Sequence, residues 1–123
     1  MQGIVLFAHG SRDPMWARPF EAIRAMVADR RPELLLELAY LERMSPTLPE
    51  AVDCLARRGA TAITLFPLFL GQGGHVRDDL PRLVGEMSAR HPGLSIALEG
   101  TVGEAPDIHA AIAGWVDSRL GER

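Results

Sequence analysis

Short runs of apolar residues alternate along the chain with longer segments in which apolar residues recur every three or four positions. The short runs predict buried strands, and the longer segments predict helices that turn one face toward a core. The expected strands cover residues 4–8, 34–41, 61–70 and 94–98. The expected helices cover residues 17–30, 46–58, 78–90 and 106–120.

Local signals set the expected helix ends. Ser45 and Pro46 fit an N-cap followed by proline at the first helical position, and Gly59 fits the left-handed cap after the same helix. Proline is tolerated in a first turn, so Pro81 suggests that the third helix begins near Asp78. The residues expected to face inward are Phe20, Ile23 and Val27 in the first helix and Leu48, Ala51, Val52 and Leu55 in the second.

Four strands that alternate with four helices predict an α/β fold. The expected architecture is one four-stranded parallel sheet with right-handed crossovers and helices on both faces, in the flavodoxin-like order 2-1-3-4. The 123 residues suffice for one core, so residues 1–123 are interpreted as a single domain. Ligands of such sheets bind beyond the carboxyl ends of the strands, here between the first and third strands.

Composition narrows the classes of protein further. The net charge of −3 and the lack of a lysine or arginine run argue against a nucleic-acid binder. The longest apolar stretch, residues 60–70, is shorter than the about 20 residues that cross a bilayer. The N-terminal residues do not follow a secretory signal pattern. Since the single cysteine, Cys54, cannot form an internal disulfide, a cytoplasmic location is expected.

Two of the four histidines fall where this fold forms a site. His9 follows the first strand, and His75 ends a glycine-rich loop just ahead of the third helix. Neutral imidazole binds metals and accepts protons, which favours a functional role. A core histidine bonded to a carbonyl, for His9, and a surface loop histidine, for His75, remain the alternatives. His91 and His109 are interpreted as structural, the latter without an evident partner.

Other motifs lead to weaker hypotheses. Gly71, Gly73 and Gly74 do not complete a dinucleotide-binding pattern, and no P-loop lysine follows them. His9-Gly10 is similar to the Arg-His-Gly loop of histidine phosphatases, but Ala8 replaces the arginine, so phosphoryl transfer is the less favoured alternative. Ser11 lacks a nucleophile-elbow setting and is expected to form a turn.

Three motifs carry a family resemblance: HGSRDP at residues 9–14, LAYLERMSPTLPEAV at residues 38–52 and PLFLGQGGHVRDDLP at residues 67–81. In this order they resemble the small class II chelatases, the sirohydrochlorin cobaltochelatase and ferrochelatase family. The resemblance implies a chelatase-like fold and a lyase that inserts Co²⁺ or Fe²⁺, in some members Ni²⁺, into sirohydrochlorin for cobalamin or siroheme synthesis. It assigns metal binding and catalysis to His9 and His75, adds Glu42 as a catalytic acidic residue, and implies no organic cofactor.

The chemistry of the substrates suggests further roles. Sirohydrochlorin is a polycarboxylate, so Arg12 and Arg77, on the two histidine segments, are expected to bind its carboxylates. Ser11, Gly73 and Gly74 are assigned to the same substrate-binding surface. Two imidazoles can hold a metal ion without enclosing it in a permanent four-ligand site. A non-catalytic carrier of metal or tetrapyrrole on the same fold would need the same histidines and remains the alternative.

The resemblance also bears on assembly. Long family members contain two such domains, whereas this chain resembles one half. One wall cannot cover both faces of a flat macrocycle, so a homodimer with a shared cavity is expected. The predicted contact lies near the loops after the second and third strands and includes Leu41, Met44 and Leu70.

Overall fold

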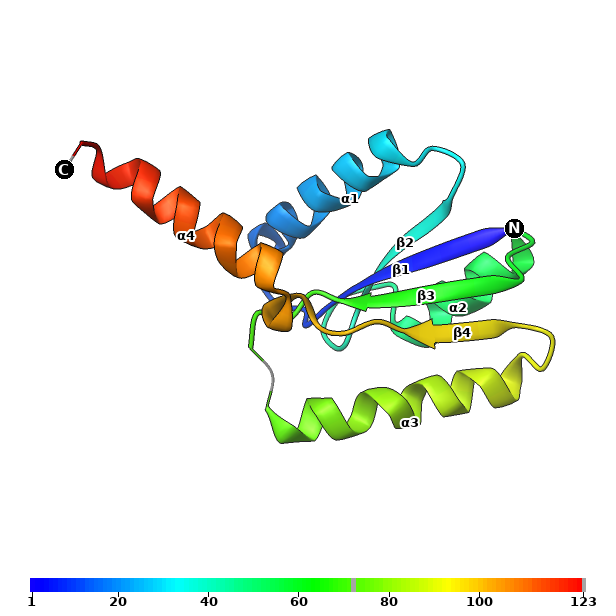
Figure 1. Cartoon of the computed structure of the whole chain (residues 1–123). Coiled ribbons are helices and arrows are strands. Elements are labelled where there is room, and N and C mark those ends of the chain that lie inside the picture. Colours follow the sequence, from blue (N-terminus) through cyan, green and yellow to red (C-terminus); the bar gives the residue numbers. More distant parts are fainter. Residues whose placement is uncertain (72, 123) are drawn as a thin grey trace.

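The computed structural model describes residues 1–71 and 73–122, without the side chain of His75. Figure 1 shows a sheet with helices beside it and one helix that projects away. The strands are β1 (Gln2–Ala8), β2 (Leu35–Tyr40), β3 (Ala62–Pro67) and β4 (Ser95–Leu98). The α-helices are α1 (Arg18–Arg30), α2 (Leu48–Arg57), α3 (Gly74–Arg90) and α4 (Pro106–Leu120), and the short 3₁₀ helices are η1 (Pro14–Ala17) and η2 (Val102–Glu104).

The four strands pair in the order β2-β1-β3-β4, and all three pairings are parallel. Leu6 at the centre of β1 lies between Leu38 of β2 and Phe66 of β3. The predicted fold class and strand order are therefore confirmed. The carboxyl ends of β1, β2 and β3 lie at one edge of the sheet, which is where the fold can form a site.

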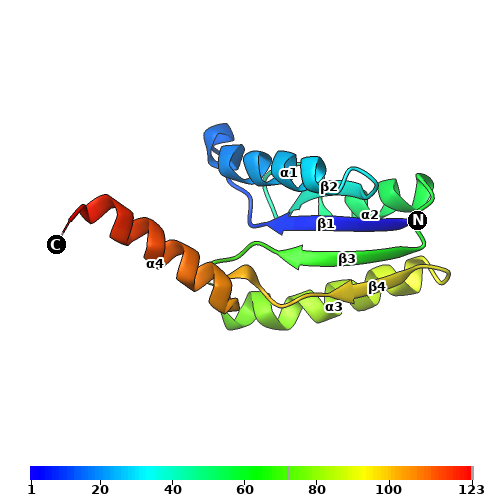
Figure 2. The same cartoon turned by 45° about the horizontal axis from the view of Figure 1, so that its top comes forward.

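Alternation of side chains along the strands gives the sheet two apolar faces. Val5 and Phe7 point to the face that α2 and α3 cover, while Ile4 and Leu6 point to the face that α1 covers. Figure 2 shows α1 and α3 on opposite sides of the strands. The predicted inward residues of α2 are all buried: Leu48, Ala51, Val52 and Leu55. In α1, Phe20 and Val27 pack on the core, but Ile23 is 40% exposed, which contradicts its predicted inward position.

The start of α2 differs from the sequence-based prediction. Thr47, not Ser45, is the N-cap, and its hydroxyl accepts a hydrogen bond from the Glu50 amide while the Glu50 carboxylate accepts one from the Thr47 amide. This reciprocal capping box satisfies two amides at once, so it outweighs a lone serine. The Ser45-Pro46 peptide is cis, and the Pro46 carbonyl accepts a hydrogen bond from the Tyr40 amide instead. Gly59 has the expected positive φ of 98°.

The third crossover also begins differently from the prediction. β3 ends at Pro67 rather than residue 70, and α3 begins at Gly74 rather than at Asp78. Pro81 consequently lies inside α3, where it has no amide to donate to the carbonyl four residues earlier. His75 therefore belongs to the first turn of α3, not to the preceding loop as predicted.

The last helix has the predicted bounds but not the predicted packing. Residues 109–120 of α4 are all exposed, and Figures 1 and 2 show the helix extending beyond the sheet. Ala97 of β4 is exposed, and its cross-strand partner Thr64 is half-buried on the side that carries α1. Within residues 1–71 and 73–122, the expectation that helices fully cover both faces is therefore wrong for the β3–β4 half of the sheet, on the side that carries α1. Within this same part of the chain, no helix has the length and apolar character to span a membrane.

Candidate active site

The two loops that follow β1 and β2 bring an imidazole and a carboxylate together. Nε2 of His9 lies 3.1 Å from Oε1 of Glu42. Their backbones continue the strand pairing, since the Leu41 amide donates to the Ala8 carbonyl at 2.9 Å and the Glu42 amide to the His9 carbonyl at 3.1 Å. The side-chain pair is thus held by an extension of the sheet. This juxtaposition links two of the residues predicted from sequence.

Gly10 makes this close approach possible. Its φ of 97° lies in the left-handed region, which favours glycine. A Cβ atom at this position would overlap the backbone carbonyl oxygen of Glu42. The glycine of the HGSRDP motif therefore allows the β1 loop to lie directly against the β2 loop, and so positions His9 beside Glu42.

The hydrogen bond to Glu42 indicates which ring nitrogen of His9 is the donor. A carboxylate only accepts, so Nε2 of His9 is the donor in this contact, and in the neutral imidazole the lone pair is then on Nδ1. Nε of Arg43 lies 4.0 Å from the same Glu42 oxygen, and Arg43 has an unusual positive φ of 67°. Both His9 and Glu42 side chains are 49% exposed, so solvent weakens this contact. The site is open to an incoming ligand.

Phe69 connects the third strand to the same site. Its ring meets the His9 ring edge-on at 6.3 Å between centroids, and it meets Phe7 of the core in the same manner at 5.7 Å. Phe69 itself is buried. The imidazole therefore packs against the core while its nitrogens remain accessible for chemistry.

A cavity of about 340 Å³ opens between this pair and α3. It is lined by His9, Leu41, Glu42, Val76, Asp79, Leu80 and Leu83. Sequence reasoning did not include Asp79, because α3 was expected to begin only one residue before it. The available signal was its spacing of four residues from His75, which places the two Cα atoms on one side of a helix that begins at Gly74.

The other described residues predicted for the site are not part of this cavity lining. The Ser11 hydroxyl accepts a hydrogen bond from the Asp13 amide at 3.1 Å, as expected of a turn serine. Arg12 and Arg77 are exposed, Gly73 is the N-cap of α3, and Gly74 is its first residue. The side chain of His75 lies outside the described part of the structure, so its approach to His9 stays a prediction. Within the described part, no three His, Cys, Asp or Glu side chains are grouped to hold a metal ion.

The remaining two histidines have structural partners. His91 is the C-cap of α3 and contacts Asp53 of α2 at 2.7 Å. Nε2 of His109 lies 2.6 Å from the Gly103 carbonyl, so the expectation that it has no partner is wrong. This bond joins the first turn of α4 to η2, whose Gly103 amide donates to the carbonyl of Phe69.

Comparison with known proteins identifies the family. The family model described as CbiX matches residues 3–120. The chain belongs to the CbiX family. A CbiX protein from Marinobacter aquaeolei VT8 has the same fold, with a TM-score of 0.88, 32% identity and 98% of each chain covered. The resemblance inferred from the three motifs is thereby confirmed.

Two further relatives bear on length and chemistry. The sirohydrochlorin cobaltochelatase of Methanocaldococcus jannaschii is 34% identical over 91 residues, which cover 74% of this chain and 64% of that one. SirB from Bacillus subtilis, solved with Fe³⁺, shares the fold at a TM-score of 0.84 and 23% identity. The match covers 99% of this chain but 48% of SirB, so this CbiX chain spans about half of the SirB length.

Proposed function

We propose that this CbiX-family protein inserts a divalent metal ion into sirohydrochlorin. The observation that carries the proposal is the His9–Glu42 pair, held at 3.1 Å at the carboxyl ends of β1 and β2 beside an open cavity. A nitrogen and an oxygen donor at a ligand-accessible sheet edge suit a site that receives and releases a metal ion. The relative from Methanocaldococcus jannaschii is named for this reaction with cobalt.

The metal ion is a substrate, so the protein must both bind it and release it. His9, with His75 as the predicted second ligand, offers too few donors for a closed structural site, so the ion can pass to the four macrocycle nitrogens. Metallation releases two pyrrole protons. Glu42 accepts a hydrogen bond from His9, and this carboxylate can take up one of the two protons as the ion transfers, while the other passes to solvent. We propose these roles together: metal binding by His9 and His75, and proton uptake by Glu42.

Binding of the macrocycle is assigned to residues around the cavity. Arg12 and Arg77 are exposed on the segments that follow β1 and open α3, where they can pair with substrate carboxylates. Ser11, Gly73 and Gly74 complete the proposed surface. Co²⁺ and Fe²⁺ are the proposed metals, with Ni²⁺ as a third candidate, since all three accept imidazole ligands. We retain a cytoplasmic location as part of the proposal.

Turnover of sirohydrochlorin tests this function. Sirohydrochlorin mixed with Co²⁺, Fe²⁺ or Ni²⁺ is expected to be metallated catalytically, above a protein-free control, as followed by its absorption spectrum. His9→Ala is expected to lower the rate about tenfold or more, which corresponds to about 1.4 kcal/mol of barrier. His91→Gln, at the opposite end of α3, is the control and should retain the rate. One stoichiometric event without turnover would instead indicate a carrier.

We further propose a homodimer, and α4 supplies an argument for how it forms. Ile112, Trp115, Val116 and Leu120 are exposed by 42, 59, 46 and 72%. Their spacing of three and four residues gathers them on one side of the helix. A 15-residue helix is marginally stable in water unless it packs against something. An apolar stripe of this size therefore calls for a partner.

The same molecule has an uncovered surface on β3 and β4 that could receive such a helix. Ser95 and Ala97 of β4 and Ala62 of β3 are exposed on the side of the sheet that carries α1. These side chains are small, so a helix can approach the strands closely. An α4 from a second copy would fill this position, and the two-fold relation would exchange both helices. Leu70, which is 67% exposed, remains in the proposed contact together with Leu41 and Met44.

Oligomeric state tests this arrangement. Trp115→Glu places a charge in the apolar stripe and is expected to convert a particle of twice 13.4 kDa to one of 13.4 kDa in light scattering. Ala110→Glu adds the same charge to the opposite side of α4 and should leave the dimer intact. A wild-type monomer at working concentration, or a Trp115→Glu dimer, would contradict the proposal.

A further inference from the structure

One face of α3 forms a wall of the cavity beside His9. Val76, Asp79, Leu80 and Leu83 recur at helical spacing and all line this space. Three of them are apolar, and Leu80 is buried. Asp79 is the polar exception, with a side chain that is 28% exposed. Asp79 thus adds an acidic residue from α3 to the lining that His9 and Glu42 also form.

We propose that Asp79 recruits the hydrated divalent metal ion into this cavity and positions it for transfer to His9. This inference rests on the proposed metal insertion and adds a residue to that site. Asp79 acts here as a positioning residue: its carboxylate attracts the ion and accepts hydrogen bonds from water molecules bound to it. The ion then exchanges those water molecules for imidazole nitrogen.

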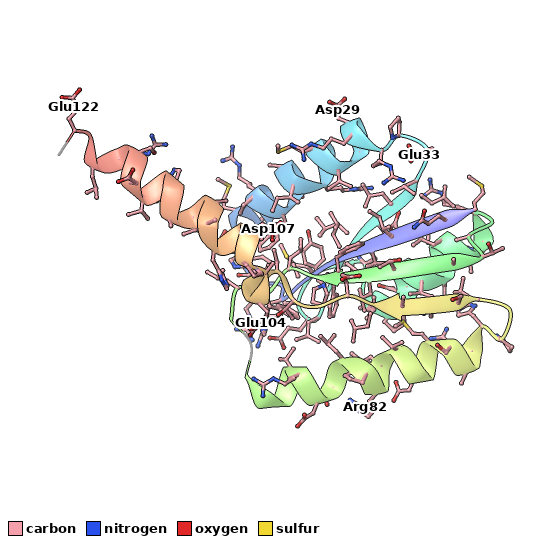
Figure 3. All side chains as sticks on the ribbon, viewed as in Figure 1. Asp29, Glu33, Arg82, Glu104, Asp107 and Glu122 are labelled. Carbon is pink, nitrogen blue, oxygen red and sulfur yellow. The ribbon has the colours of Figure 1, made fainter. Side chains whose placement is uncertain are left out.

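The charges around the cavity favour a cation. Asp79 contacts Arg82 at 3.3 Å, and the same guanidinium contacts Glu86 at 2.8 Å, so these three side chains together carry a charge of −1. Arg82 is on the side of α3 turned away from the sheet, as Figure 3 shows, and is 59% exposed. Its positive charge is therefore on the outside, whereas Asp79 is among the residues that line the cavity. Apolar walls strengthen the resulting field at an incoming ion.

Oxygen chemistry fits a step that comes before ligation. Divalent ions in water carry a shell of oxygen ligands, and carboxylates interact with such ions directly or through bound water. Imidazole nitrogen is the better ligand for Co²⁺ and Fe²⁺ once water has left. An aspartate that contacts the ion before His9 does therefore lets the ion change stepwise from water ligands to a nitrogen ligand. Such a step speeds the association of the metal ion with the site without binding the ion too tightly for release.

Two neighbouring aspartates give a matched test. Asp78→Asn and Asp79→Asn remove the same charge one residue apart, but Asp78 is exposed and is not part of the cavity lining. Asp79→Asn is expected to raise the KM for Co²⁺ about fivefold or more, with kcat and the KM for sirohydrochlorin within about twofold of wild type. Asp78→Asn should match wild type. In wild type, added salt should lower kcat/KM for Co²⁺ more steeply than in Asp79→Asn.

A second measurement does not depend on turnover. Titration of the full chain with Co²⁺, followed by calorimetry, should show weaker binding in Asp79→Asn than in Asp78→Asn. Arg82→Gln breaks the same ion pair but keeps the carboxylate, so it should bind Co²⁺ at least as well as wild type. Asp79→Glu should recover part of the loss. Equal Co²⁺ affinity and KM in both asparagine variants would overturn the inference, whereas absent turnover with an intact affinity difference would refute only the proposed function.

Discussion

Two residues with positive φ angles shape the loops of the site. Gly10, at 97°, lets the β1 loop lie against the carbonyl of Glu42, and Arg43, at 67°, turns the β2 loop so that its guanidinium lies near the Glu42 carboxylate. A non-glycine residue in this region stores about 1 to 2 kcal/mol of strain. The geometry of His9 and Glu42 thus depends on backbone conformations that neither side chain could produce alone.

Substitution of Gly10 tests this dependence. Gly10→Ala should destabilise the fold by more than about 1 kcal/mol in urea unfolding and reduce metal insertion, because the new Cβ overlaps the Glu42 backbone. Gly85→Ala, at an exposed position of α3 where a Cβ meets nothing within 4 Å, should stabilise the fold by about 0.5 to 1 kcal/mol. If both variants had the same stability, the close approach would not constrain the loops.

Sequence alone could identify some of these residues but not others. His9 was predictable, because an apolar strand that ends abruptly in a histidine is visible in the letters. Asp79 was not, because its importance depends on where α3 begins, and Pro81 suggested a start at Asp78 rather than Gly74. The contact between His9 and Glu42, 33 residues apart, required the register of β1 with β2 as well as the resemblance to the family.

At the level of elements, periodicity was the reliable signal and boundaries were not. The buried face of α2 was predicted because Leu48 and Leu55 repeat at helical spacing against a polar remainder. Its cap was assigned wrongly because two candidates, Ser45 and Thr47, lie two residues apart, and only the structure reveals the reciprocal bonds with Glu50. The capping box also anchors the end of the loop that carries Glu42, so it supports the site.

The choice between the two caps has a direct test. Thr47→Ala should lower the free energy of unfolding by about 1 kcal/mol, because it removes the acceptor of the Glu50 amide. Ser45→Ala, two residues earlier, should change it by less than about 0.5 kcal/mol, the usual size of a surface effect. Urea unfolding followed by circular dichroism measures both. The opposite ranking would restore Ser45 as the cap.

At the scale of the whole molecule, topology was predictable and helical cover was not. Alternating strands and helices lead to a parallel sheet because each helix returns the chain to the start of the next strand, and the order β2-β1-β3-β4 agrees with the prediction. The spacing of the large apolar residues in α4 is the same whether Trp115 packs on its own sheet or on another chain. Sequence therefore defined the helix but could not say which sheet it covers. An exposed stripe on α4 and an uncovered half-sheet together suggest exchange between copies.

Such an exchange would make stability and activity depend on protein concentration. Burial of each large apolar side chain contributes about 1.5 to 3 kcal/mol, so the α4 stripe would provide much of the dimer's stability. The melting temperature of wild type should therefore rise with protein concentration, because assembly is linked to folding. The melting temperature of Trp115→Glu should not depend on protein concentration, or this variant should fail to fold fully. Calorimetry distinguishes these two outcomes. Metal insertion per chain should likewise fall when wild type is diluted until light scattering detects 13.4 kDa particles. Constant activity per chain across that transition would mean that one copy forms the complete site, and that α4 serves assembly without serving catalysis.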